Sequence, residues 1–426
     1  MRGRAILAVC AALALTASAP AGSQPTTLSV AGRSNGTPSI AADGRFVAVA
    51  WGATAGAKTD VFTAVSRNGG QTFSRPVQVN AVAGEAHLGG EMPPRIALAR
   101  RSRAADPDIV VLWTARGDST AIKSARSRDG GRTFGTPITL QSQGAPGNRG
   151  WPSLALDTHG TAHVMWLDHR GLAASSGGHM NHADHKTAAP RDAVQMAGRS
   201  GLYYAAAGKG TDAHERELTT GVCYCCKTAL AAGADGALFA AWRHVYPGNL
   251  RDIAFSVSRD AGRSFSSPAR VSEDRWAIDG CPDDGPALTV DTHGVVHIVW
   301  PTVVGGAAPE GALFYASSRD GRAFTTRMRI PNLGSLRPSH PQIAVDASGR
   351  ITVAWDELIN GERVAALRQL KPQSDGTIAF GPIVRLADSG RATYPVMASA
   401  ATGLVFAWTS GTPEASVISV RAITMP

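Results

Sequence analysis

The chain has 426 residues, of which 18% are charged, and a formal net charge of +9 at pH 7. A basic protein can bind nucleic acid, but here many arginines fall inside repeated turn sequences and would be spread around the molecule, so we expect no nucleic-acid partner. These arginines are Arg67, Arg128, Arg132, Arg259, Arg263, Arg319 and Arg322.

The first 21 residues have the pattern of a secretory signal. Arg2 and Arg4 precede an apolar stretch over residues 5–17, and small residues at 17–21 offer cleavage patterns. The stretch is shorter than the about 20 residues that a membrane span needs. We therefore predict a signal peptide over residues 1–21, export to the periplasm or the medium, and no membrane span.

Seven tryptophans recur at nearly even spacing along the rest of the chain. Each ends the second of two alternating segments joined by a turn, most clearly over residues 151–166, 285–300 and 340–355. Alternation with period two predicts strands with one buried face, and the Asp-x-x-Gly step is typical of a hairpin turn. The series is Trp51, Trp113, Trp166, Trp242, Trp300, Trp355 and Trp408.

A second hairpin follows most of these. It carries the pattern Ser-x-Asp/Asn-x-Gly-x-Thr/Ser-Phe at residues 66–73, 127–134 and 258–265, with shorter copies at 318–324 and 374–380. The Asp side chain can accept hydrogen bonds from turn amides, and Gly can take the left-handed conformation. Two hairpins per repeat predict a four-stranded antiparallel blade.

The repeats together predict one all-β domain over residues 22–426, a β-propeller with seven blades, or alternatively six. The last repeat, from residue 394, is short, and we expect the early strand at residues 26–30 to complete it and close the ring. An insertion over residues 171–201 follows Trp166.

The second hairpins resemble the Asp-box motif, S-x-D-x-G-x-T-F/W, of the sialidase superfamily, also called the bacterial neuraminidase repeat. The resemblance spans nearly the whole mature chain and implies a propeller fold. Residues 223–229, 242–252 and 278–286 also resemble a Cys-rich bacterial subset of sialidase-like proteins. That resemblance implies that one site contains Cys223, Cys225, Cys226, Arg243, Tyr246, Arg251 and Cys281.

In a propeller, the residues before each inner strand and those after each second strand lie on one face, and the Asp turns lie on the other. We therefore expect a site at the mouth of the central channel. The residues before the inner strands are Glu91, Arg95, Trp151, Cys225, Cys226, Asp283, Asp284, His340 and Tyr394. Those after the second strands are Asp168, His169, Arg170, Arg243, His244, Asp356 and Glu357.

The cysteines leave three hypotheses open: disulfides, including a bridge from the cluster to Cys281 that would join adjacent blades; a metal site; or a redox-active thiol pair. Thiolates and imidazoles together suit copper or zinc. The candidate metal ligands are Cys223, Cys225, Cys226, Cys281, His169, His179, His182 and His185.

Our leading hypothesis is an exported, monomeric binding propeller whose Cys/His/Arg site holds a transition metal or a small anionic ligand. Candidate ligand-binding residues are Arg170, Arg243, His244, Tyr246, Arg251, Asp283 and Asp284. One alternative is an exo-alpha-sialidase or another glycoside hydrolase, with Tyr394 as nucleophile and Arg95, Arg243, Asp168 and Glu357 as further catalytic residues. Another is a scaffold that binds a second exported protein.

Overall fold

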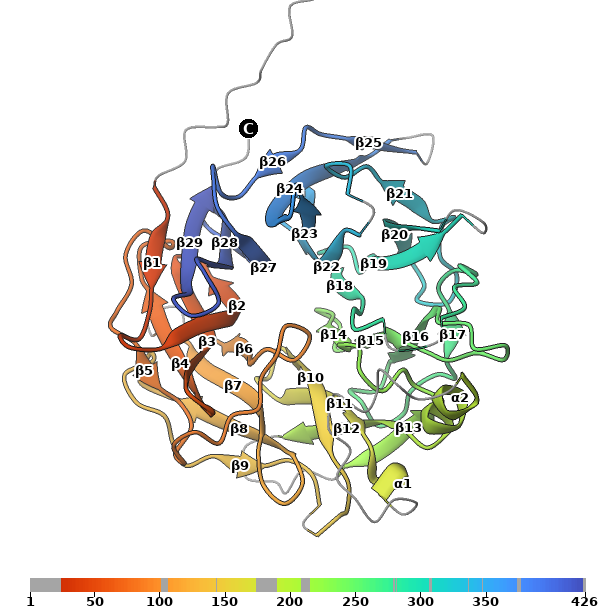
Figure 1. Cartoon of the computed structure of the whole chain (residues 1–426), viewed down its shortest axis with the longest axis horizontal. Helices are drawn as coiled ribbons and strands as arrows, with labels where there is room; N and C mark the ends of the chain where they lie inside the picture. The colour runs from red at the N-terminus through yellow and green to blue at the C-terminus, as the bar shows by residue number, and fades with distance from the viewer. Residues whose placement is uncertain are drawn as a thin grey trace, which may run out of the picture.

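The computed structural model describes residues 24–100, 106–142, 144–173, 190–207, 215–278, 280, 282–305, 309–335, 337–346, 348–373 and 377–423. In these residues seven β-sheets are arranged in a ring around a central axis, as Figure 1 shows. Each sheet has four strands in antiparallel order, and one has an additional short strand. The prediction of a single all-β propeller with seven blades is therefore confirmed.

The first four blades follow the chain outward from the axis. They are β2 (Ser34–Asp43), β3 (Phe46–Ala55), β4 (Lys58–Ser66) and β5 (Val77–Gln78); β6 (Arg95–Ala99), β7 (Asp108–Ala115), β8 (Ala121–Ser127) and β9 (Ile138–Thr139); β10 (Arg149–Leu156), β11 (Ala162–Asp168), β12 (Gly201–Ala207) and β13 (Arg216–Thr220); and β14 (Ala229–Ala232), β15 (Leu238–Arg243), β16 (Ile253–Ser258) and β17 (Ala269–Arg270). Two short helices, α1 (Arg170–Ala173) and α2 (Pro190–Gly198), lie between β11 and β12.

The last three blades complete the ring. They are β18 (Ala287–Val290), β19 (Val296–Val304), β20 (Glu310–Ser318) and β21 (Met328–Ile330); β22 (Ser339–Val345), β23 (Ile351–Ile359), β24 (Glu362–Pro372) and β25 (Ile378–Phe380), with β26 (Val384–Arg385) also on β24; and β27 (Ala392–Ala400), β28 (Gly403–Ser410) and β29 (Val417–Ile423). The inner strands of neighbouring blades contact one another around the axis.

The ring closes through its two ends. The seventh blade has three strands from the C-terminal end of the chain, and its outermost strand is β1 (Thr26–Leu28), which pairs antiparallel with β29. Thr26 lies opposite Val420, and Leu28 lies opposite Ile418. The expected closure by the early strand is confirmed, and it joins the first and last blades by backbone hydrogen bonds.

The seven tryptophans form the same part of every blade. Each lies on the second strand and is at most 1% exposed. Their side chains pack between adjacent sheets with Val, Ile, Leu and Ala residues from the neighbouring strands. A buried aromatic side chain contributes roughly 2–3 kcal/mol of hydrophobic free energy, so the tryptophan repeat supplies a large share of the inter-blade core.

The Ser-x-Asp turns join the third and fourth strands. In the second blade, Ser127 Oγ accepts a hydrogen bond from the Gly131 amide at 2.9 Å, and Asp129 accepts bonds from both the amide and the hydroxyl of Thr133. These bonds hold the pKa of the Asp129 carboxyl well below its usual range, although its slight burial opposes the shift. The first such turn also bonds to the β2–β3 hairpin, through the Gly69 amide and the Arg45 carbonyl.

The turns therefore lie on the face where the inner strands end. The face where the inner strands begin, which we call the entry face, is free of them. Among the described residues, no helix combines the length and the apolar character that a bilayer crossing requires.

Candidate functional site

Four inner strands share a β-bulge on the entry face. In β2, β10, β22 and β27 the pairing register shifts around an X-Pro step. The residue before the proline has a positive φ of 50–55° in each case, a region that disfavours side chains other than Gly. The four bulge residues are Thr37, Trp151, His340 and Tyr394. The bulge thus places one non-repeating side chain close to the axis at this face in each of these four blades.

Two of these bulge residues meet across a blade boundary. The rings of His340 and Tyr394 lie 4.4 Å apart, and His340 Nδ1 lies 2.9 Å from a carboxylate oxygen of Asp356. Asp356 is fully buried, also accepts the Tyr394 amide, and pairs with Arg363. Gly90 lies beneath Tyr394, since a Cβ there would sit 2.4 Å from the phenol oxygen.

This His–Asp pair changes the protonation of both groups. Burial alone would lower the pKa of His340, but the Asp356 carboxylate outweighs it and raises that pKa. Burial would raise the pKa of Asp356, yet His340 and Arg363 hold it below the usual range. Burial, with Asp356 adding to it, raises the pKa of the Tyr394 phenol. The cluster therefore favours the imidazolium form of His340, the carboxylate form of Asp356 and the neutral phenol of Tyr394.

A second group of charges lies beside this cluster and extends to the fourth blade. Glu91 accepts hydrogen bonds from the amides of Lys227 and Gly285, at 3.2 and 2.8 Å. The ammonium of Lys227, which is 4% exposed, lies 3.7 Å from the Glu91 carboxylate and donates to the Pro341 carbonyl. Asp284 accepts the His340 amide, and burial together with Glu91 raises the pKa of its carboxyl to about 6.

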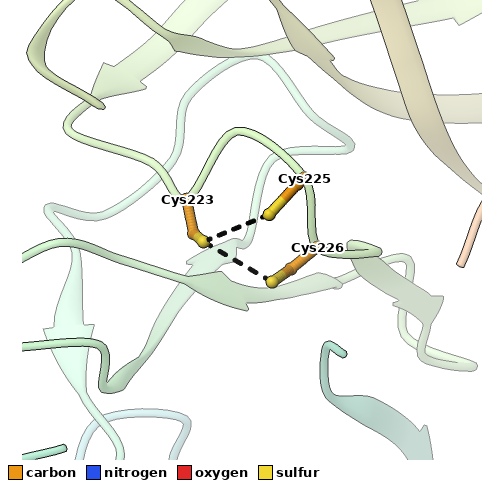
Figure 2. A group of neighbouring side chains, drawn as sticks. All are labelled: Cys223, Cys225 and Cys226. Carbon is orange, nitrogen blue, oxygen red and sulfur yellow. Dashed lines mark hydrogen bonds between the residues drawn. The ribbon is translucent and has the colours of Figure 1, made fainter. Parts of the chain in front are cut away.

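The cysteine cluster directly precedes Lys227 in the chain. The Cys223 Sγ lies 3.5 Å from the Cys226 Sγ and 3.9 Å from the Cys225 Sγ, as drawn in Figure 2. All three cysteines are at most 2% exposed. Cys223 and Cys226 are free thiols, whereas Cys225 is disulfide-bonded.

The two free thiols differ in acidity. The hydrogen bond with Cys226 lowers the pKa of Cys223 to about 6, and the Arg251 and Arg243 guanidiniums add to this effect against the opposing effect of burial. Burial, with Cys223 adding to it, raises the pKa of Cys226 well above its usual value. Near neutral pH the pair therefore holds one thiolate and one thiol.

The two arginines reach this cluster in different ways. Arg251 is fully buried and donates from Nη1 to the Cys223 Sγ at 3.3 Å and from Nε to Asn249. Arg243 directs its donors to the backbone carbonyls of Asp284, Arg251 and Pro301 and stacks over Trp276. Arg243 therefore joins the fourth and fifth blades, and its charge lowers the pKa of Cys223 through space rather than through a hydrogen bond.

Three predicted site residues each bond to a repeat tryptophan, and their spacing from that tryptophan could have indicated the bond. Asp168, His244 and Glu357 stand two positions after a repeat tryptophan, and each accepts that tryptophan's indole N–H. Asp168 is further held by Arg149 and Arg170. Glu357 also accepts two amides and the Asn332 side chain. The pattern Trp-x-acceptor was the available signal.

The remaining predicted residues lie around these groups. Arg170 bridges Asp168 and Glu215, His169 packs between the rings of Trp151 and Tyr224, and Arg270 stacks on Tyr246. Burial and the nearby Arg270 lower the pKa of His244 to about 4. Arg95 donates to the Pro152 carbonyl, and burial lowers the pKa of its guanidinium to about 10 against the effect of Glu91. Asp283, beside Asp284, is exposed. The remaining candidates, Cys281, His179, His182 and His185, lie outside the described residues.

Sequence reasoning missed Lys227, Arg149 and Arg363 as parts of these clusters. A buried Lys directly after C-x-C-C carries no motif of its own, because its partner Glu91 comes from another part of the ring. Arg149 and Arg363 pair with carboxylates of their own blades, Asp168 and Asp356, and no repeated spacing marks these pairs. The predicted arginines Arg95, Arg170, Arg243 and Arg251 are each engaged with different partners in the structure.

No protein family and no curated protein matches this chain in sequence. Solved structures do match it in shape. A polysaccharide lyase of family PL25, an ulvan lyase, aligns with a TM-score of 0.57 and 10% identity over 91% of this chain and 94% of its own. A protein of unknown function from Dyadobacter fermentans aligns with a TM-score of 0.52 and 13% identity over 95% and 99% of the two chains.

A microbial sialidase, Hz136, aligns with a TM-score of 0.49 and 16% identity over 86% of this chain and 74% of its own. The likeness to the lyase and to the Dyadobacter protein shows the propeller fold. At identities this low it carries no information on substrate or catalytic residues.

Proposed function

We propose that this protein is an exported binding propeller whose cysteine cluster holds a soft transition metal, in particular copper(I), when Cys225 is reduced. The observation that carries the proposal is the sulfur geometry: the Sγ atoms of Cys223, Cys225 and Cys226 lie within 4.8 Å of one another in a buried setting. Thiolate ligands select soft metals, and burial excludes competing water.

The ligand set favours copper over zinc. Structural zinc sites almost always have four protein ligands in a tetrahedron, whereas this group offers three cysteines and, among the described residues, no His, Asp or Glu that joins them. Copper(I) accepts thiolates and tolerates lower coordination numbers. The low pKa of Cys223 favours binding, because a metal must otherwise displace the thiol proton.

The arginines support the thiolates more than they support an anionic ligand. All the hydrogen bonds of Arg243 go to backbone carbonyls, and Arg251 donates to Cys223 itself. A hydrogen bond to a thiolate stabilises its charged form, so Arg251 would tune the metal site from outside the ligand set. Of the two ligands in our hypothesis, the transition metal is therefore better supported than the small anion.

The test is an anaerobic copper(I) titration of the fully reduced protein against a chromophoric copper(I) chelator. We expect one equivalent to be withdrawn from the chelator by the native chain. The variants Cys223→Ser and Cys226→Ser should each weaken binding at least tenfold. His169→Gln is the matched control, because His169 packs on Trp151 and Tyr224 rather than on the sulfurs. Unchanged affinity in the double cysteine variant would refute the site.

A second candidate function is a carbohydrate-active enzyme at the channel mouth. It is favoured by the Tyr394–His340–Asp356 cluster on the entry face, in which the phenol ring contacts the imidazole and the carboxylate bonds to the imidazole and to the Tyr394 amide. Turnover of a fluorogenic sialoside, lost in Tyr394→Phe but kept in Cys223→Ser, would favour this function over metal binding. No turnover of sialosides or of other glycoside substrates would remove it.

Export is part of the proposal and rests on residues 1–21 alone. N-terminal sequencing of the protein recovered from the periplasm or the medium of its host should show a mature chain that begins near residue 22. An intact Met1 would contradict export.

A further inference from the structure

A short hairpin before β6 carries the chain to the mouth of the central channel. The Gly89 amide donates to the Met92 carbonyl at 3.2 Å, and the Met92 amide donates to the Gly89 carbonyl at 3.0 Å, so Gly90 and Glu91 form its tip. In Figure 1 it is the segment beside β6 that extends toward the centre of the ring. We call residues 86–94 the mouth hairpin.

The tip of the mouth hairpin contacts blades on the other side of the ring. Tyr394 of the seventh blade lies against Gly90, where a Cβ would sit 2.3 Å from the phenol ring. Met92 is buried and packs against Gly150 of the third blade, where a Cβ would sit 2.8 Å from the Met92 Sδ. Glu91, which is 5% exposed, bonds to the segments that lead into the fourth and fifth blades. A hairpin from between the first two blades therefore closes the mouth against four others.

The Glu91 carboxylate fills a site that those other blades build. One of its oxygens accepts the amides of Lys227 and Gly285 at 3.2 and 2.8 Å, and the Lys227 ammonium lies 3.7 Å from the other oxygen. The two amides converge because Gly285 has no side chain, since a Cβ there would sit 2.2 Å from the Lys227 carbonyl oxygen. Two convergent amides beside a buried ammonium bind carboxylates by charge-assisted hydrogen bonds.

Glu91 occupies this site without using all of it. Among the described residues, its oxygen that faces Lys227 accepts no hydrogen bond, and the buried Nη2 of Arg95 donates none. Glu91 also repels the neighbouring Asp284 carboxyl, whose pKa burial and Glu91 together raise to about 6. A free carboxylate can rotate until both of its oxygens are hydrogen-bonded, which the tethered side chain does not achieve. The Glu91 contact is therefore one that another carboxylate can replace.

Glu91 is also the polar anchor of the tip. Within the part of the chain that the structure describes, every hydrogen bond from residues 88–92 to another blade ends on the Glu91 carboxylate. The tip includes Gly89 and Gly90, which have the widest conformational freedom of any residue type, and a Cβ at Gly89 would meet nothing within 4 Å. Loss of the Glu91 contact therefore leaves the tip held by packing alone.

We propose that the Lys227 and Gly285 amides, with the Lys227 ammonium, form a carboxylate-binding site at the channel mouth that Glu91 occupies as an intramolecular ligand. A molecule that carries a carboxylate group binds there by displacing the tip of the mouth hairpin. The chain without ligand is self-inhibited, because the apparent affinity for a ligand falls in proportion to the fraction of chains in which the site is open. The proposal uses no cysteine and does not depend on copper binding.

The experiment is a titration with sodium acetate followed by thermal melts, with sodium chloride at equal ionic strength as the reference. Glu91→Ala removes the atoms that acetate replaces, so its melting temperature should rise along a saturating one-site curve. Glu91→Gln is the matched control, because an amide of the same size stays in the site. The acetate affinity of the native chain and of Glu91→Gln should be at least tenfold lower than that of Glu91→Ala. Acetamide, which has the same shape and no charge, should bind Glu91→Ala at least tenfold more weakly than acetate does.

A second variant opens the site without changing the carboxylate or its donors. In Gly90→Ala the new Cβ cannot share the space of the Tyr394 ring, so the tip must move and withdraw Glu91. We expect its acetate affinity to exceed that of the native chain at least tenfold. In the native chain, hydrogen exchange of the peptide over residues 86–94 should become faster with acetate but not with chloride, because displacement releases the tip.

Three results would overturn the proposal. The first is equal stabilisation of the native chain, Glu91→Ala and Glu91→Gln by acetate, which is a general salt effect. The second is a folded Glu91→Ala that does not respond to acetate. The third is failure of both Glu91→Ala and Gly90→Ala to fold, which would make the mouth hairpin a fixed part of the core. The copper titration is a separate measurement, so the proposed function is decided independently of the acetate result.

Discussion

The two faces of the ring use the same blades in different ways. On the face of the Ser-x-Asp turns, the hydrogen bonds of a turn are made by its own residues. In the second blade, Ser127 and Asp129 accept hydrogen bonds from Gly131 and Thr133 of the same turn. On the entry face, the polar groups are completed by other blades, since Glu91 accepts amides from Lys227 and Gly285. The hydrogen bonds within a turn repeat from blade to blade, whereas the arrangement around Glu91 occurs once.

This difference separates fold from function. A locally satisfied turn stabilises one hairpin and can be copied around the ring without consequence for its neighbours. A cluster built across blades depends on ring closure, places unlike charges together, and perturbs their pKa values, which is the property expected of a functional site. We therefore expect substitutions on the entry face to change the free energy of unfolding more than substitutions in the Ser-x-Asp turns do. We also expect the pH dependence of that change at Asp284 to have the opposite sign to the one at Asp129.

The largest effect is expected from Asp356→Ala. It removes the buried partner of His340 and Arg363 and the acceptor of the Tyr394 amide. Breaking a buried, hydrogen-bonded ion pair should lower the free energy of unfolding by about 3 kcal/mol. Urea denaturation at pH 7 measures it. A loss below about 1 kcal/mol, the level of a surface pair, would show that these buried ion pairs do not stabilise the fold as proposed.

A smaller effect, with a distinctive pH dependence, is expected from Asp284→Asn. Because the folded-state pKa of Asp284 is raised to about 6, its ionisation costs stability as pH rises from about 4 to about 6. The variant lacks this cost, so its free energy of unfolding should exceed that of the native chain by up to about 3 kcal/mol above pH 6. Below pH 4 the two chains should converge. Urea midpoints measured across this range would reveal an absent or opposite trend.

The smallest effect is expected from Asp129→Ala on the turn face. It removes local hydrogen bonds at a solvent-accessible turn, for a loss of about 1 kcal/mol at pH 7. The sign of its pH dependence is opposite to that of Asp284: the folded-state pKa of Asp129 is depressed, so its stabilisation is present above the unfolded pKa and is lost as pH falls below about 4. Native and variant chains compared at pH 7 and pH 3 would show the difference shrink.

The fold could be predicted from the sequence because its determinants repeat. Trp51 and its six counterparts mark the second strand of each blade, and residues 26–30 were recognisable as the strand that closes the ring. The site could be predicted only in outline. Strand order places C-x-C-C on the entry face, but the engagement of Arg243 with carbonyls depends on the fifth blade, and no spacing encodes it.

The acidity of the cysteines was equally out of reach of sequence reasoning. The pKa values of Cys223 and Cys226 differ because the hydrogen bond between them, with Arg251 adding to it, lowers the pKa of Cys223, whereas burial dominates at Cys226. Their environments come from β15, β16 and the segment between them, which lie outside the C-x-C-C motif in the sequence. Identical residue types three positions apart therefore acquire opposite pKa shifts only in the folded ring.

The three cysteine sulfurs must act as one site if they are to hold copper(I), and X-ray absorption spectroscopy of the copper(I)-loaded, fully reduced protein tests this directly. We predict a first coordination shell made of sulfur alone, which is lost in the Cys223→Ser/Cys226→Ser double variant together with the bound copper. A shell of nitrogen or oxygen atoms, or the same spectrum in the double variant, would contradict the central claim.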